Sequence, residues 1–132
     1  MAIEGINERL GKGIYTPTVE DKVRMTLNDV GKAVTRARAL GVPVAFGTDA
    51  GVFEHGRNGQ EFALLVKHGL TTREALASAT TVAAKLLSLD NEIGQIAPGM
   101  SADMIAVSGD PLSDVTVLEK VDWVMVRGRI AD

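Results

Sequence analysis

The sequence predicts an α/β fold followed by a small β-rich segment, and two observations carry this prediction. A helical pattern of apolar residues ends at a glycine and is followed directly by the short apolar run 42–46. Helices and buried parallel strands alternate in this order. The composition changes near residue 93, after which short apolar runs are separated by turn residues. We therefore divide the chain into a leader or loop (1–17), a helix-strand-helix segment (18–90) and a β-rich segment (91–132).

The first predicted helix covers residues 18–40. Its apolar residues recur every three or four positions between Val23 and Ala37, so they share one helical face. At the amino end, Thr18 followed three residues later by Asp21 is typical of a capping box. A glycine directly after residue 40 favours the end of the helix at that point.

The middle of the chain is predicted to hold a strand, a loop and two helices. The run 42–46 is apolar and rich in valine, and Pro43 lies near its beginning, where a missing backbone donor is tolerated. A polar, glycine-punctuated loop is expected over 52–60 and a short helix over 60–68. The next helix is predicted over 72–89, because a threonine and a glutamate three residues apart form a second capping box at its start.

The β-rich segment is predicted to contain short strands joined by turns. The strands cover 103–107 and 121–126, and Ile130 follows a further turn. Residues 97–100 carry proline and glycine at the two central positions, which is the pattern of a type II turn. These strands either form a small sheet alone or pair with strands of a second copy.

Length and composition exclude several classes of protein. With 132 residues the chain is too short for a complete (β/α)8 barrel, which takes about 250 residues. The absence of cysteine excludes a disulfide framework and a thiol nucleophile. Lys and Arg number 14 against 17 Asp and Glu, without basic clusters, so we expect no nucleic-acid partner. We expect a cytoplasmic protein without a membrane partner, because the sequence has no signal peptide and no apolar run near about 20 residues.

Asp49 is the first candidate functional residue. It lies directly after the predicted strand 42–46, at the edge where α/β folds bind ligands. Small residues on both sides leave space beside its carboxylate. One interpretation is a metal ligand or general base. The other is a side chain that caps the following turn through its own backbone.

The loop after Asp49 holds the second group of candidates. His55, Arg57 and Asn58 together could hold an anionic group of a substrate, although a solvated loop has the same composition. His68, at the end of a predicted helix, is assigned no function. The sequence has two histidines and neither H-x-H nor H-E-x-x-H, whereas a catalytic zinc takes three protein ligands.

Together, these stretches resemble the carboxyl-terminal part of the amidohydrolase superfamily, in particular its imidazolonepropionase-like and prolidase-like metal-dependent members. The stretch from Gly41 to Gly51 resembles the last barrel strand of that family with its catalytic aspartate. The other stretches that carry the resemblance are 55–61, 69–76, 79–84, 94–99, 102–103 and 109–112. The fold that the resemblance implies is the end of a (β/α)8 metal-dependent hydrolase barrel, with its last strand and helices, plus a small β-sandwich segment.

The resemblance implies a hydrolase of C–N bonds that activates water on one or two divalent metal ions, typically zinc. Asp49 matches the aspartate of the last strand, which in that family binds the metal and relays a proton from water to the leaving nitrogen. His55 and Asn58 lie in the loop that borders the substrate. The substrate implied for the full-length enzyme is a small amide or dipeptide-like molecule.

The other metal ligands of that family have no counterpart in this sequence. The H-x-H pair, the bridging lysine and two later histidines are missing, so we expect the isolated chain to bind no metal stably and to be inactive. Two further hypotheses are a non-catalytic α/β module that self-associates and a small ligand-binding domain. Because the edges of 42–46 would lack neighbours, we expect a homo-oligomer.

Overall fold

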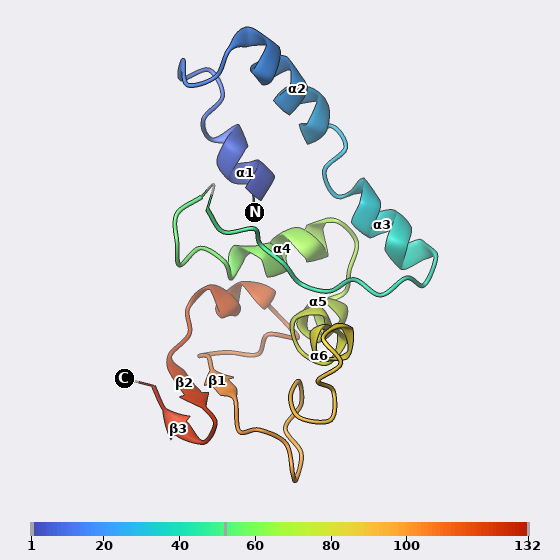
Figure 1. Cartoon of the computed structure of the whole chain (residues 1–132), viewed down its shortest axis with the longest axis vertical. Helices are drawn as coiled ribbons and strands as arrows, with labels where there is room; N and C mark the ends of the chain where they lie inside the picture. Colours follow the sequence, from blue (N-terminus) through green and yellow to red (C-terminus); the bar gives the residue numbers. More distant parts are fainter. Residues whose placement is uncertain (1, 52, 132) are drawn as a thin grey trace.

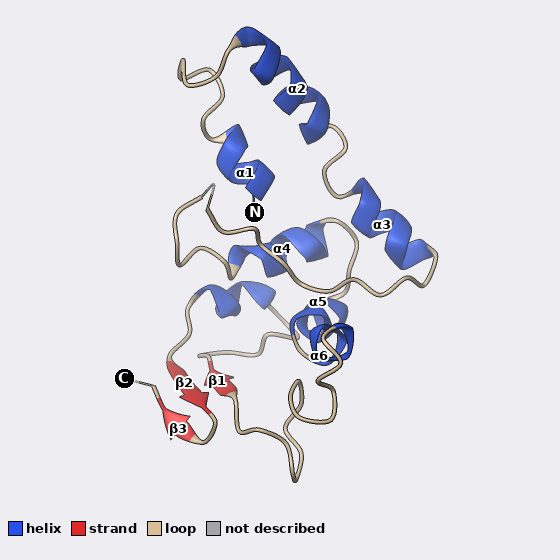
Figure 2. Ribbon diagram, in the orientation of Figure 1, coloured by secondary structure: helices blue, strands red, loops and turns tan. Residues whose placement is uncertain are grey.

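The computed structural model describes residues 2–51 and 53–131. It combines helices with one small antiparallel sheet (Figures 1 and 2). The elements are α1 (Ala2–Asn7), α2 (Pro17–Leu27), α3 (Lys32–Ala39), α4 (Gln60–Lys67), α5 (Thr72–Ala79), α6 (Thr81–Leu86), β1 (Met104–Ala106), the 3-10 helix η1 (Val115–Glu119), β2 (Trp123–Val126) and β3 (Arg129–Ile130). Among the described residues, no helix has the length and apolar character that a membrane crossing requires.

The amino-terminal part differs from the predicted loop and single long helix. Residues 2–7 form α1, and the predicted helix 18–40 is two helices, α2 and α3. Gly31 separates them with a φ of 80°, a left-handed conformation that a right-handed helix cannot continue through. The predicted capping box at Thr18 is also wrong, because α2 begins at Pro17 and no side chain caps it. Proline suits the first helical position, where its missing N–H costs nothing.

The predicted strand 42–46 belongs to no sheet within the part of the chain that the structure describes. It runs as an open stretch of chain past α4 and α5 (Figure 1). The Val42 N–H donates to Ala37 O at 2.9 Å, and the Phe46 N–H donates to Ser78 O at 2.9 Å. These bonds join the stretch to the ends of two helices, so it packs against the protein without a strand partner.

The core lies between this stretch and helices α4 and α5. Its buried centre is Leu65, Leu70 and Ala75, with half-buried apolar side chains packed around it. Phe46 stacks on Phe62 of α4 with ring centroids 4.5 Å apart, a distance typical of favourable aromatic pairs. Val44 packs against the same cluster. The apolar run 42–46 is therefore a core element although it is not a ladder strand.

The capping box predicted at the start of α5 is confirmed. The Thr71 hydroxyl accepts from the Glu74 N–H at 3.1 Å, and Glu74 Oε2 accepts from the Thr71 N–H. The bond from the Thr71 backbone, followed by that from Arg38, holds the pKa of Glu74 below its ordinary value. The single helix predicted over 72–89 is wrong in extent, because Thr80, with φ −123° and ψ −97°, separates α5 from α6.

The carboxyl-terminal strands form one sheet in the order β1-β2-β3, with both pairings antiparallel. The strands predicted at 103–107 and 121–126 are present but shorter, and β3 contains Ile130. The predicted turn at 97–100 also forms: the Met100 N–H donates to Ala97 O at 3.2 Å and Gly99 has a φ of 85°. The segment thus makes a small sheet within this chain.

Candidate functional site

Asp49 lies where the core stretch 42–46 leaves the interior. It has a φ of 50°, a left-handed conformation that aspartate tolerates better than most residues. Its side chain is exposed, and within the described residues it makes no hydrogen bond or ion pair. The alternative, in which it caps the following turn through its own backbone, has no such bond among the described residues. The carboxylate is therefore available to a ligand from outside this segment.

A hydrogen bond holds Asn58 next to the bend at Asp49. Its Nδ2 donates to the Thr48 hydroxyl at 2.8 Å, and both side chains are partly buried. Thr48 directly precedes Asp49, so this bond ties the loop after the bend back onto the bend. The amide carbonyl of Asn58 keeps its capacity to accept a further hydrogen bond. The sequence did not indicate this pairing, because nothing in the spacing of the two residues requires it.

Arg57 is committed to a partner far away in the sequence. Its guanidinium donates two hydrogen bonds to the Glu8 carboxylate, at 2.7 and 3.1 Å. This pairing raises the pKa of Arg57 and lowers the pKa of Glu8. The hypothesis that His55, Arg57 and Asn58 together hold an anionic group stays a prediction, and in the described structure the charge of Arg57 is paired with Glu8. The sequence did not indicate a role for Glu8, since it lies within the predicted leader.

His55 occupies the exposed part of the same loop. Its imidazole faces solvent, while Phe53 nearby is buried, with 6% of its surface exposed. The loop is thus anchored at one end by Phe53 and at the other by Asn58. The structure brings Asn58 to the Asp49 bend and leaves His55 at the surface of the loop.

The described residues do not fit a complete metal centre. Across 2–51 and 53–131, no group of three or more His, Cys, Asp or Glu side chains is placed to hold a metal ion. A catalytic zinc takes three protein ligands and a water molecule. Asp49 is a single exposed carboxylate, and one carboxylate does not retain zinc in water.

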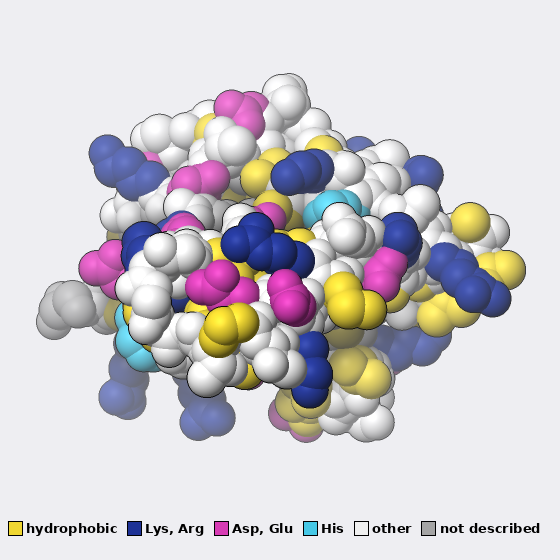
Figure 3. Space-filling model, turned by 90° about the horizontal axis from the view of Figure 1, so that it is seen from above, with side chains coloured by type: hydrophobic (Ala, Val, Ile, Leu, Met, Phe, Trp, Pro, Cys, Tyr) yellow, Lys and Arg dark blue, Asp and Glu magenta, His cyan; other side chains and the backbone are white. Residues whose placement is uncertain are grey.

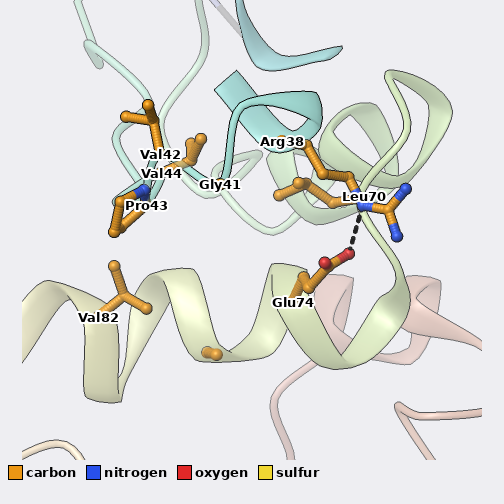
Figure 4. A pocket seen from close by; sticks show the side chains of 9 residues that line it. Arg38, Gly41, Val42, Pro43, Val44, Leu70, Glu74 and Val82 are labelled. Atoms are coloured by element: carbon orange, nitrogen blue, oxygen red, sulfur yellow. Dashed lines mark hydrogen bonds and ion pairs between the residues drawn. The ribbon is translucent and has the colours of Figure 1, made fainter. Parts of the chain in front are cut away.

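Residues 42–46 also border two hollows, and Asp49 lines neither of them. The first hollow, of about 220 Å³, is lined by residues that include Arg38, Val44, Leu70 and Glu74. Figure 4 shows the Arg38–Glu74 ion pair, 2.8 Å between Nε and Oε2, at one side of this hollow. Because the pair satisfies both charges, this hollow offers apolar walls rather than a free charged group. On the face seen in Figure 3, acidic and basic side chains are interspersed.

Comparison with known proteins gives consistent matches. A model of the amidohydrolase family matches residues 7–131. Uncharacterised proteins of Mycobacterium tuberculosis and Mycobacterium bovis are 41% identical over 101 residues, which is 73% of this chain and 25% of theirs. This chain thus spans about a quarter of the length of these curated relatives.

Solved structures match over nearly the whole chain. A Xaa-Pro dipeptidase with methionine bound in its active site has a TM-score of 0.90 and 35% identity, covering 99% of this chain and 33% of its own. A prolidase complexed with N-methylphosphonate-L-proline has a TM-score of 0.87 and 28% identity, covering 98% of this chain and 33% of its own. An amidohydrolase from Thermotoga maritima matches more distantly, at a TM-score of 0.65 and 25% identity over 77% of this chain and 26% of its own. The chain belongs to the amidohydrolase family, and its similarity is to the prolidase-like members of that family.

Proposed function

We propose that this chain is the carboxyl-terminal portion of a metal-dependent hydrolase that cleaves C–N bonds in small amide or dipeptide-like substrates. The observation that carries the proposal is the match to a Xaa-Pro dipeptidase, which covers 99% of this chain and 33% of the dipeptidase at a TM-score of 0.90. Amidohydrolases generally depend on metal ions, and zinc is the metal we expect in the full-length enzyme.

In this proposal, residues 42–46 are the last strand of a (β/α)8 barrel, and 91–132 are part of a β-sandwich beside it. Two features support this arrangement. The stretch 42–46 packs on helices through Val44 and Phe46 but pairs with no strand in the described residues. Asp49 then follows at the carboxyl end of the stretch, where barrel enzymes place catalytic residues.

Asp49 is proposed as the catalytic and metal-binding residue of this segment. Its carboxylate is exposed and makes no hydrogen bond or ion pair with the described residues, so it is suited to take a proton from a water molecule and to pass it to a leaving nitrogen. Since the described residues do not hold a metal by themselves, the remaining ligands must come from outside this segment.

His55 and Asn58 are proposed to contact the substrate. Asn58 is positioned by its bond to Thr48, so its carbonyl can accept an N–H of a dipeptide-like molecule. His55 lies on the same loop and can reach a ligand without unmaking any contact in the described structure. Arg57 is left out of the substrate site because Glu8 neutralises it.

The proposal is tested by exchanging this segment into a relative. The chain replaces the matching third of the Xaa-Pro dipeptidase, and hydrolysis of Xaa-Pro dipeptides is measured with and without a chelator. The Asp49→Asn variant of the chimera is expected to lower kcat about 10²–10⁴-fold, the usual contribution of a positioned acid–base group. The matched control is Asp90→Asn, which changes another exposed aspartate and leaves kcat unchanged.

The isolated 132-residue chain is assayed in parallel and is expected to show no hydrolysis, with or without added zinc. Chelator-sensitive hydrolysis by the isolated chain would show that it contains a complete site and would contradict the proposal. Equal activity of the Asp49→Asn and Asp90→Asn chimeras would remove Asp49 from the mechanism.

A further inference from the structure

One loop, residues 53–59, contains both residues that are proposed to contact the substrate. His55 is exposed in its middle, and Asn58 is partly buried near its end. The carbonyls of Arg57, Asn58 and Gly59 accept hydrogen bonds from the first residues of α4 at 3.0, 3.1 and 3.3 Å. The end of the loop is therefore held by the helix that follows it, whereas the part around His55 depends on other contacts.

The 3-10 helix η1 packs against the same end of the loop. A Cβ built on Gly59 would lie 2.6 Å from the Leu118 carbonyl oxygen and 2.9 Å from Glu119 Cα, so η1 contacts the loop backbone directly. Leu118 is buried, with 7% of its surface exposed. Gly59 is thus fixed between η1 and α4, and any displacement of the loop must occur in the residues before it.

Arg57 connects those residues to the amino-terminal helix α1. Its Nη2 and Nη1 donate to Glu8 Oε1 and Oε2 at 2.7 and 3.1 Å, and its Nε donates to Gln60 Oε1 at 3.3 Å. Two parallel N–H···O bonds fix the plane of the guanidinium as well as its distance from the carboxylate. The arginine side chain is 31% exposed and that of Glu8 51%, so water screens the pair only in part.

Glu8 is itself held at the end of α1. Its N–H donates to Glu4 O at 2.9 Å and continues the helix by one residue. Helix α1 contacts α2, and the Gly11 N–H between them donates to Glu20 Oε1 at 3.0 Å. In Figure 1, the 53–59 loop extends from the start of α4 towards α1. The loop is therefore joined to a support that is distant in the sequence.

We propose that Glu8 is a positioning residue: through Arg57 it holds the 53–59 loop so that His55 and Asn58 are presented to the substrate. Arg57 lies between these two residues in the sequence, so its fixed guanidinium restricts the backbone on both sides. The inference rests on the hydrolase function proposed above, because that function gives the two residues their contacts with the substrate.

Loss of the ion pair is expected to weaken substrate binding more than the chemical step. Loop residues that are free to move must be ordered when the substrate binds, which costs binding free energy. Asp49, which is proposed to move the proton, shares no hydrogen bond or ion pair with Glu8 or Arg57 in the described residues. Removal of the Glu8 carboxylate should therefore raise KM and leave kcat within about twofold.

The first test measures the loop in the 132-residue chain, without substrate. A glutamyl endopeptidase cleaves after glutamate, and Glu54 is an exposed residue of the loop. Glu8→Gln keeps the size of the side chain and removes its charge. It is expected to speed cleavage after Glu54 about threefold or more, relative to cleavage after the exposed Glu92 in the same digest. Glu4→Gln is the matched control, because Glu4 also lies on α1 and makes no hydrogen bond to the arginine; it leaves the ratio unchanged.

The second test uses the chimera with the Xaa-Pro dipeptidase, which contains both residues of the ion pair. Glu8→Gln is expected to raise KM for Xaa-Pro dipeptides about 3–10-fold, and Glu4→Gln leaves KM unchanged. Glu8→Arg combined with Arg57→Glu restores an ion pair of reversed polarity, and the Gln60 amide can donate to the new carboxylate. This double variant is expected to return KM and the cleavage ratio towards their wild-type values. A role of Glu8 in overall folding alone would lower the apparent kcat without raising KM.

Three results overturn the proposal. Equal cleavage ratios in Glu8→Gln and wild type would show that the ion pair does not hold the loop. Faster cleavage with an unchanged KM would show that the position of the loop does not matter to the substrate. A double variant no better than Glu8→Arg alone would show that Glu8 does not act through Arg57. An inactive chimera contradicts the hydrolysis proposed above and with it the substrate role of the loop, whereas the cleavage ratio still shows whether Glu8 anchors the loop.

Discussion

At Gly31 the absence of a side chain allows His68 to pack directly against the backbone. A Cβ at this position would lie 1.9 Å from His68 Nδ1, and the His68 Nε2 atom is buried without a hydrogen-bond partner in the described residues. The Thr35 hydroxyl donates to the His68 carbonyl at 2.7 Å and holds the same region together. Gly31 therefore fixes the junction of α2 and α3 against the end of α4.

Replacing Gly31 by alanine is expected to lower the free energy of unfolding by about 2–5 kcal/mol. The left-handed φ of 80° costs a β-carbon about 1–2 kcal/mol, and the clash with the His68 ring adds an overpacking cost of about 1–3 kcal/mol. Urea denaturation measures the loss. Gly41→Ala separates the two effects, because Gly41 has a φ of 67° and a Cβ there meets nothing within 4 Å; equal losses in both variants would contradict a role for His68.

The candidate site shows which positions and contacts of single residues could be predicted from the sequence. Asp49 followed from its position after an apolar run, and the structure places it in the exposed bend that such a position implies. The bond between Asn58 and Thr48 and the pairing of Arg57 with Glu8 depend on how distant segments meet. Local sequence patterns contain no information on such contacts, so the pairing of Arg57 with Glu8 could not be predicted.

Among the elements, two of those defined by local chemistry were predicted correctly, whereas the capping box at Thr18 was not. The capping box at Thr71 and the turn at 97–100 formed because each is satisfied by atoms within a few residues. The helix breaks at Gly31 and Thr80 were missed because the apolar pattern continues across them. An isolated glycine inside a helical pattern is a weak signal, and the left-handed φ of Gly31 and its close approach to His68 are visible only in the structure.

The hairpin of β2 and β3 contains a turn whose sequence does not match its geometry. Val126 pairs with Arg129, so Arg127 and Gly128 form a two-residue turn with φ values of 49° and 75°. Two positive φ values are typical of a type I′ turn, which prefers Asn-Gly. Arginine at the first position is therefore strained.

Arg127→Asn is expected to raise the free energy of unfolding by about 0.5–1 kcal/mol, since asparagine adopts the left-handed conformation more readily. The backbone bond from the Arg127 N–H to Asp103 Oδ1, 2.8 Å long, survives the change. Thermal and urea unfolding measure the gain. Arg129→Asn is the control at a strand position and should give no gain; a loss of stability in Arg127→Asn would mean that the arginine side chain makes a contact worth more than the strain.

At the scale of the whole molecule, only a small part of the described chain is buried. The buried apolar residues are few and the cluster around Leu65 is small, whereas matched structures are about three times longer than this chain. If, as proposed, the chain is the end of a barrel enzyme, a catalytic centre assembled from several strand ends is expected to be incomplete here, and the described residues hold no group placed to bind a metal ion.

This incompleteness predicts that zinc does not stabilise the isolated chain. If the single Asp49 carboxylate binds Zn²⁺ with a dissociation constant of about 1 mM or weaker, about 0.1 mM zinc adds less than about 0.1 kcal/mol to the free energy of unfolding. Thermal unfolding with zinc and with a chelator should therefore coincide within error. This expectation would be contradicted by a zinc-dependent rise in Tm that Asp49→Asn abolishes and Asp90→Asn leaves in place. Such a rise would show that this segment alone supplies enough ligands around Asp49 to retain the metal.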